Sequence, residues 1–311
     1  MDSGILIIDK PAGLTSHDVV SRLRRILKTK KIGHTGTLDP FATGVLVMLV
    51  GSATRLAQFL DKDEKSYEAL VRFGFETDTG DKTGNPKQED AEKEKRGEVE
   101  LNDLENKINE VLPEFTGEIE QIPPMYSAKK VKGKKLYEMA RKGIEIEREP
   151  IKVNIGKLQV LDYGLPKNEY AGTQDIGLSV TCSAGTYIRT LAEDIGRRID
   201  VPCHLAELRR TGAGKFKIAN AVTLEKLEEL QEAESTPEIL VSMNEAISHL
   251  PKVKLDKKQT EQIKNGMRFD FTSEKFADEQ VFRMCDEMEN LIAVGIFDKT
   301  GEYIQPRIVI V

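Results

Sequence analysis

The strongest candidate for chemistry in this sequence is an acidic residue in a turn rich in glycine and proline. Asp39 is followed by Pro40 in the segment 31–50, which ends in an apolar run. Glycine opens backbone conformations that other residues avoid, and proline stiffens the turn, so the carboxylate is positioned. The glycines of this segment are Gly33, Gly36 and Gly44. Local chemistry alone favours a plainer alternative, an ordinary loop with an Asx-type hydrogen bond.

Two other residues stand where a side chain can serve a site. Tyr67 lies in the alternating segment 65–73, which predicts a strand, and a tyrosine in a strand is more often a core or cross-strand residue. Arg189 follows a glycine turn and lies in the first turn of a predicted helix. It can serve a site or simply pair with Glu193 or Asp194 on its own helix, and both alternatives stay open.

The elements that must position these residues are a mixture of strands and helices, which predicts an α+β fold. Strands are expected at 5–8, 45–50, 65–73, 151–162 and 175–182. Helices are expected from the N-cap Ser16 to Leu27 and at 52–60, 101–112, 188–196, 203–210, 223–232 and 236–248. The polar run 84–100 predicts an exposed loop.

The character of the chain changes at Pro251. Beyond it, short extended segments surround one helical segment near 257–265, and the turn 298–301 separates the last two strands. This pattern predicts a small β-rich module of about 60 residues. We therefore expect two domains, 1–249 and 250–311.

The composition is that of a water-soluble globular protein, with 32% charged and 39% hydrophobic residues. No apolar run approaches the roughly 18 residues that a membrane-spanning helix needs. The N-terminal segment lacks the basic region of a signal peptide, so we expect a cytoplasmic protein without membrane contact. The three cysteines are far apart and expected to be reduced. No histidine has metal-ligand spacing to another histidine or a cysteine, so no metal is expected.

Positive charge is concentrated although the net charge is −6. The segments 22–31 and 129–142 are strongly basic, whereas acidic residues gather at 89–105 and 225–238. The second basic segment belongs to a stretch, 121–145, that has two prolines near its start and carries aromatic and methionine side chains beside its lysines. Such a stretch suits an arm that stacks on bases and neutralises phosphates. A solvated lysine loop explains the charge but leaves the prolines and Met125-Tyr126 without a reason.

Four separated segments together resemble the TruB-type tRNA pseudouridine synthases. They are Gly33-His-Thr-Gly-Thr-Leu-Asp39-Pro40, Lys65-Ser-Tyr67, Pro123-Pro-Met-Tyr-Ser-Ala128 and Gly185-Thr-Tyr-Ile-Arg189. The resemblance covers residues 1–215 well, and the last 60 residues more weakly resemble the PUA RNA-binding module. It implies a mixed, largely antiparallel central sheet with flanking helices and an RNA-binding arm. It also implies that uridine 55 in the T loop of tRNA is isomerised to pseudouridine without a cofactor.

The resemblance assigns roles to three catalytic candidates. Asp39 matches the catalytic aspartate, which either attacks the nucleotide or removes a proton from the sugar. Arg189 matches an arginine that pairs with this aspartate, keeps it ionised and orients it. Tyr67 matches a tyrosine that stacks under the uracil and assists removal of the C5 proton.

The remaining candidates are expected to bind the RNA. A base inside a folded loop cannot reach a pocket, so the uridine must be flipped out. His34 matches a histidine that fills the space behind the flipped base, and Leu208 is expected to form an apolar wall. The arm would close on the T arm of tRNA. The other expected substrate-binding residues are Tyr187, Met125, Tyr126, Lys129, Lys130 and Lys132.

Two alternatives share parts of this pattern. A guide-RNA-dependent relative that modifies ribosomal RNA in a protein complex has the same aspartate and arginine motifs, but the basic arm favours a stand-alone enzyme, which we expect to be a monomer. A non-catalytic RNA-binding or tRNA-folding protein would explain the arm and the β-rich module. It leaves the set Asp39, Tyr67 and Arg189 unexplained.

Overall fold

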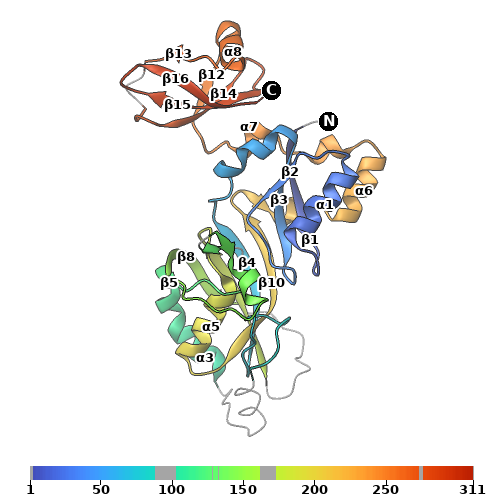
Figure 1. Cartoon of the computed structure of the whole chain (residues 1–311), viewed down its shortest axis with the longest axis vertical. Coiled ribbons are helices and arrows are strands. Elements are labelled where there is room, and N and C mark those ends of the chain that lie inside the picture. The colour runs from blue at the N-terminus through green and yellow to red at the C-terminus, as the bar shows by residue number, and fades with distance from the viewer. Residues whose placement is uncertain are drawn as a thin grey trace.

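The computed structural model describes residues 3–87, 103–127, 129–131, 133–161, 173–272 and 276–310. The molecule is elongated, with three parts in a row (Figure 1). The C-terminal module lies at one end, and a part built from the N-terminal strands and the helices near residue 230 is in the middle. The described residues from β4 (Lys65–Phe73) to α5 (Ile188–Arg198) form the other end. Residues 88–100 of the predicted exposed loop lie outside the described residues.

One large sheet runs through the middle and the lower part of the molecule. Its strand order is β1-β3-β10-β4-β9-β8-β5, with β2 paired to β3 and β11 paired to β10. All pairs in it are antiparallel except β10 with β3, which confirms the predicted mixed, largely antiparallel sheet. The strands are β1 (Gly4–Lys10), β2 (Ile32–Thr35), β3 (Thr43–Val50), β4 (Lys65–Phe73), β5 (Gly117–Gln121), β8 (Ile151–Val160), β9 (Gln174–Cys182), β10 (Cys203–Ala213) and β11 (Phe216–Lys217).

The helix expected at 203–210 is wrong, because this segment is the long strand β10. Its apolar residues Leu205 and Leu208 are three apart, which imitates a helical period. A bulge between Leu205 and Glu207 shifts the pairing with β4 and lets both leucines lie on the buried side of a strand. Hydrogen bonding to β3 and β4 on its two sides then fixes the extended conformation.

The N-cap of helix α1 (Ser16–Ile26) lies one residue earlier than expected. Thr15 is the N-cap and forms a capping box with Asp18. Ser16 is freed by this arrangement, and its hydroxyl accepts a hydrogen bond from the Leu38 backbone N–H over 2.9 Å. The start of the helix therefore holds the turn that carries Asp39.

Most of the other helices lie on the faces of the large sheet, and α4 (Leu136–Ala140) belongs to the arm (Figure 1). The other helices are α3 (Leu104–Val111), α4, α5 (Ile188–Arg198), α6 (Leu224–Glu232) and α7 (Met243–Ala246), with a 3-10 helix at Gly51–Phe59. The helix expected at 236–248 is interrupted, because Val241 forms a two-way backbone bridge with Ile5 of β1. Only a 3-10 turn at Thr236–Ile239 and the short α7 remain of it.

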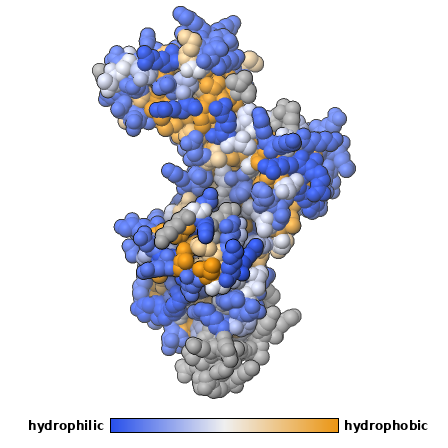
Figure 2. Space-filling view, in the orientation of Figure 1, coloured by the Kyte–Doolittle hydropathy of each residue, from blue (hydrophilic) through white to orange (hydrophobic). Residues whose placement is uncertain are grey.

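The C-terminal module is a five-stranded sheet with one helix, α8 (Lys257–Lys264), as the sequence predicts. Its strands, in spatial order, are β12 (Lys252–Lys254), β14 (Val281–Cys285), β15 (Leu291–Asp298), β16 (Tyr303–Val309) and β13 (Phe269–Asp270). Ile308 and Ile310 share an apolar cluster with Ile5 and Ile247 of the middle part. Figure 2 shows apolar surface on the module and toward its junction with the rest of the chain.

Candidate active site

Asp39, in the turn between β2 and β3, and Arg189, in the first turn of α5, form an ion pair. The Arg189 Nε lies 2.9 Å from one Asp39 carboxylate oxygen, and its Nη2 donates to the other over 3.2 Å. Glu193 and Asp194, the alternative partners on α5, instead pair with Arg197. The pairing expected from the sequence is therefore present, and it has the two-point geometry in which arginine holds a carboxylate best.

The Asp39 turn is fixed by a buried lysine from β1 and by a glycine within the turn. Lys10, at the end of β1, is fully buried, and its ammonium donates to the carbonyls of Pro11, Leu14 and Pro40 over 2.7–3.2 Å. Gly36 has a φ of +67°, a conformation that glycine adopts without strain. The turn is therefore held by Lys10, a residue that the sequence analysis did not predict for the site.

Arg189 is itself held by three further acceptors. Its guanidinium donates to the carbonyls of Thr79 over 2.9 Å and Tyr126 over 2.7 Å, and it lies 3.7 Å from the Asp81 carboxylate. Asp81 is buried and was not singled out from the sequence. The sequence signal that could have indicated this position of Asp81 is the run of small polar residues around Gly80, which favours a tight turn.

Burial and charge set the protonation states of the site. Loss of hydration raises the pKa of the Asp39 carboxyl, and the adjacent Arg189 guanidinium counteracts that rise. Burial also raises the pKa of Tyr67, so its phenol is neutral near pH 7. Burial lowers the pKa of His34, which favours its neutral ring.

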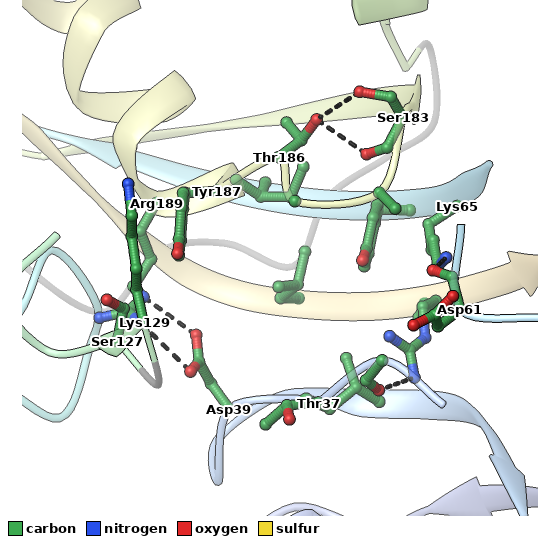
Figure 3. Close-up of a pocket in the computed structure, with 18 residues that line it drawn as sticks. Thr37, Asp39, Asp61, Lys65, Ser127, Lys129, Ser183, Thr186, Tyr187 and Arg189 are labelled. Atoms are coloured by element: carbon green, nitrogen blue, oxygen red, sulfur yellow. Dashed lines mark hydrogen bonds and ion pairs between the residues drawn. The ribbon is translucent and has the colours of Figure 1, made fainter. Parts of the chain in front are cut away.

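Two cavities adjoin at the ion pair. The smaller, about 230 Å³, contains Asp39 and Arg189 at one side and is also lined by Tyr67, Tyr187 and Leu208. Figure 3 shows the Asp39–Arg189 pair on one side and Lys65 and Asp61 on the other, with Ser183 and Thr186 along the far rim. The larger, about 730 Å³, is the one that His34 lines. Both are lined by Thr37, Leu38, Asp39, Ser127 and Arg189.

The arm contributes to both cavities. Tyr126 lines the larger cavity and Lys129 the smaller one. Lys130 is exposed in the hairpin of β6 (Lys130–Val131) and β7 (Lys134–Lys135). Met125 is half-buried and lines neither cavity, and Lys132 lies outside the described residues. The structure thus brings most of the expected residues together and leaves Met125 beside the site.

Two cationic residues of the smaller cavity were not singled out from the sequence. Lys65 and Arg210 are buried side chains that line it. The Lys65 ammonium donates to the backbone carbonyls of Asp61 and Asp63. Both residues lie in segments that look like plain strand or helix, so only the three-dimensional pairing of β4 with β10 reveals them.

The fold and the paired aspartate and arginine define a pseudouridine synthase. Residues 24–188 match the N-terminal domain of the TruB family pseudouridylate synthases, and residues 189–248 match the C-terminal domain described for tRNA pseudouridylate synthase B. The chain belongs to the TruB family of pseudouridylate synthases, a group of isomerases.

Similar proteins cover nearly all of the chain. A protein of Bacillus cytotoxicus named tRNA pseudouridine synthase B is 45% identical over 265 residues, which are 85% of this chain and 83% of the relative. One of the same name from Solibacter usitatus is 42% identical over 295 residues, 94% of each chain.

Solved structures share the fold. A chain in a Cbf5-Nop10-Gar1 complex has a TM-score of 0.70 and 27% identity, covering 99% of this chain and 85% of that one. A chain in an H/ACA RNP bound to a substrate RNA containing 2'-deoxyuridine has the same TM-score at 25% identity, with the same coverage of both chains.

Two further findings concern the described residues. Within them, no group of three or more histidine, cysteine or acidic side chains could hold a metal ion. The helices in the same ranges include none that is long and apolar enough to cross a membrane.

Proposed function

We propose that this protein is a stand-alone tRNA pseudouridine synthase that isomerises uridine 55 of the T loop. The observation that carries the proposal is the ion pair between Asp39 and Arg189 at the wall of a cavity of about 230 Å³. The Arg189 side chain is 6% exposed and that of Asp39 is 33% exposed. The arginine is sealed in the protein while the carboxylate keeps an open side for a substrate.

The reaction needs a group that reacts with the sugar when C1′ becomes electron-poor. When the N1–C1′ bond breaks, Asp39 either bonds to C1′ or removes the proton of C2′, and Arg189 holds its carboxylate in one orientation. The base turns and C5 then bonds to C1′, after which the C5 proton leaves. Tyr67 lies in the same cavity and is the group proposed to assist that last step.

The base must leave the folded loop to reach Asp39. Unstacking costs a few kcal/mol, so a group that fills the vacated space favours the flipped state. His34 lines the larger cavity next to Asp39, and its neutral ring suits this space-filling role. Leu208 and Tyr187 would then form walls for the flipped uracil.

The arm and the C-terminal module support a tRNA substrate. The exposed lysines of the arm stand beside the cavities, where they can neutralise phosphates of the T arm. We propose that residues 1–249 form the synthase domain and 250–311 a PUA-like RNA-binding domain, and that the protein acts in the cytoplasm as a monomer. The relatives named tRNA pseudouridine synthase B favour this substrate over the guided reaction, since one of them matches 94% of the chain.

The test is incubation of the purified protein with an unmodified tRNA transcript, followed by detection of pseudouridine at position 55. Product without a guide RNA or partner proteins is expected. A protein that needs both would be the guided enzyme instead. Tight tRNA binding with no product at all would make it a non-catalytic RNA-binding protein.

A further inference from the structure

Arg210 is a buried cation at the cavity wall that the reaction described above does not use. The residue is 1% exposed and lines the smaller cavity together with Asp39 and Tyr67. Its Nε donates to the Val45 carbonyl over 2.6 Å and its Nη2 to the Gly36 carbonyl over 3.0 Å. These bonds anchor the guanidinium to β3 and to the turn that carries Asp39, while other N–H groups of the guanidinium stay uncommitted to the backbone.

The register of the sheet explains how this arginine reaches the cavity. β10 lies between β3 and β4, where Arg210 is opposite Gly44 on one side and Tyr67 on the other. Cross-strand partners present their side chains on the same face, so the guanidinium and the Tyr67 ring share a face. Gly44 has no side chain to compete, and a Cβ there would lie 2.2 Å from the Arg210 carbonyl oxygen.

The two arginines of this cavity differ in their counterions. Arg189 is neutralised by Asp39 and by the more distant Asp81. In the ranges that the structure describes, no carboxylate pairs with Arg210 within 4.0 Å. Lys65 adds a second cation to the same cavity, and Asp61 is the acidic residue at that side. Burial of a cation without a carboxylate counterion is costly, so an anionic partner in the working complex would account for it.

We propose that Arg210 stabilises the negative charge of the uracil ring while the ring is detached from the sugar. The inference rests on the proposed function. When the N1–C1′ bond breaks, its electron pair stays with the base, and the charge is shared by N1 and the carbonyl oxygens. Asp39 meets the electron-poor C1′ or takes the C2′ proton. After C5 bonds to C1′, C5 loses its proton and N1 gains one, so the charge disappears and the product is an isomer.

The position of Arg210 suits a charge that exists only during the reaction. Its bonds to Val45 and Gly36 fix the guanidinium before the substrate arrives, so little reorganisation is needed when the charge develops. Arg189 instead holds the Asp39 carboxylate, which meets the sugar. The cavity therefore has a neutralised side for the sugar and a cationic side for the base.

The experiment compares Arg210→Gln and Arg210→Lys in single-turnover reactions at saturating protein. The substrates are tRNA transcripts with uridine or 5-fluorouridine at the target position, and consumption of the original nucleoside is followed. The 5-fluorouracil anion is less basic and needs less stabilisation. We expect Arg210→Gln to slow the uridine reaction about 100-fold and the 5-fluorouridine reaction clearly less. Arg210→Lys should recover at least tenfold of the uridine loss.

Arg209→Gln is the matched control, since this neighbour on β10 pairs with Asp9 away from the cavity and its loss should leave both rates unchanged. Melting temperature and tRNA affinity are measured for each variant. If Arg210→Gln does not fold, the ratio of the two losses in Arg210→Lys serves the same purpose. Equal losses on both substrates would overturn the inference and make Arg210 merely structural. A wild-type protein without product would instead overturn the proposed function, and the inference with it.

Discussion

The Asp39 carboxylate and the Arg189 guanidinium share a two-point ion pair although they lie 150 residues apart in the chain. Asp39 lies in the turn after β2, and Arg189 lies in the first turn of α5. The Arg189 guanidinium also donates to the Thr79 and Tyr126 carbonyls. Because these hydrogen bonds fix its orientation, its position is set before any substrate enters.

Replacement of the acid should remove the chemistry and leave RNA binding intact. Asp39→Asn keeps the shape of the side chain but removes the nucleophilic or basic carboxylate, so we expect the single-turnover rate to fall by about 10³-fold or more. Pseudouridine formation and tRNA affinity are measured side by side. Asp194→Asn, which removes an acid from the surface of α5, should keep the wild-type rate. Comparable rates in the two variants would remove Asp39 from the reaction.

Loss of the partner cation should change the pH dependence of the reaction. Arg189 lowers the pKa of Asp39 against the effect of burial, so Arg189→Gln lets that pKa rise. The activity needs the ionised carboxylate, and the acidic limb of the pH–rate profile should therefore move to higher pH, by about one unit or more. Arg197→Gln on the same helix is the control and should not move the limb. An unshifted limb in Arg189→Gln would mean that the arginine does not tune the acid.

His34 should be replaceable by a side chain of similar size. His34→Phe keeps the volume, so we expect it to stay within about tenfold of the wild-type rate, whereas His34→Ala should lose more because it leaves the vacated space in the RNA empty. With a substrate whose target uridine is already unpaired, the difference in rate between His34→Ala and the wild type should become smaller. If Phe and Ala lose activity equally on both substrates, the imidazole acts as a proton carrier.

The arm should set the salt dependence of tRNA binding. Each lysine that contacts a phosphate adds about 0.7–0.9 to the slope of log affinity against log salt. We expect Lys130→Gln and Lys134→Gln each to reduce the slope by roughly this amount. Lys152→Gln removes a lysine that pairs with Glu118 on the surface of β8 and should leave the slope unchanged. A wild-type affinity independent of salt would contradict the proposed RNA contacts.

Lys10 should make stability depend on pH in an unusual direction. Burial lowers its pKa to about 8 in the folded protein, from 10.5 for an unperturbed lysine. Between these values the unfolded chain binds more protons, so this lysine makes the folded state more stable as pH rises through the window. From pH 7.5 to 9.5, the unfolding free energy of the wild type should rise by about 1–2 kcal/mol relative to that of Lys10→Met. Urea unfolding at the two pH values measures it, and a constant difference would refute the shifted pKa.

The sequence was most informative where local pattern and motif agree. The turn around Asp39 and the alternation of β4 at Tyr67 were both visible in it, and the Asp39–Arg189 pair followed from the resemblance. Asp81 and Arg210 could not be found in the same way, because each becomes a site neighbour only through long-range pairing. Asp81 reaches the site because its loop folds back toward Arg189 of α5. Arg210 lies on β10, whose bulge gives its apolar residues a spacing typical of a helix.

The order of the chain has a consequence for how the site is made. β10 joins the half of the sheet that holds β1 and β3 to the half that holds β4 and β9, and it supplies Leu208 and Arg210. It is also the last long strand of the large sheet to be synthesised. During translation the acid of the site therefore leaves the ribosome long before the strand that closes the cavity, and loop closure over such a distance is slow. The cavity that contains Asp39 is therefore complete only when β10 is inserted between β3 and β4.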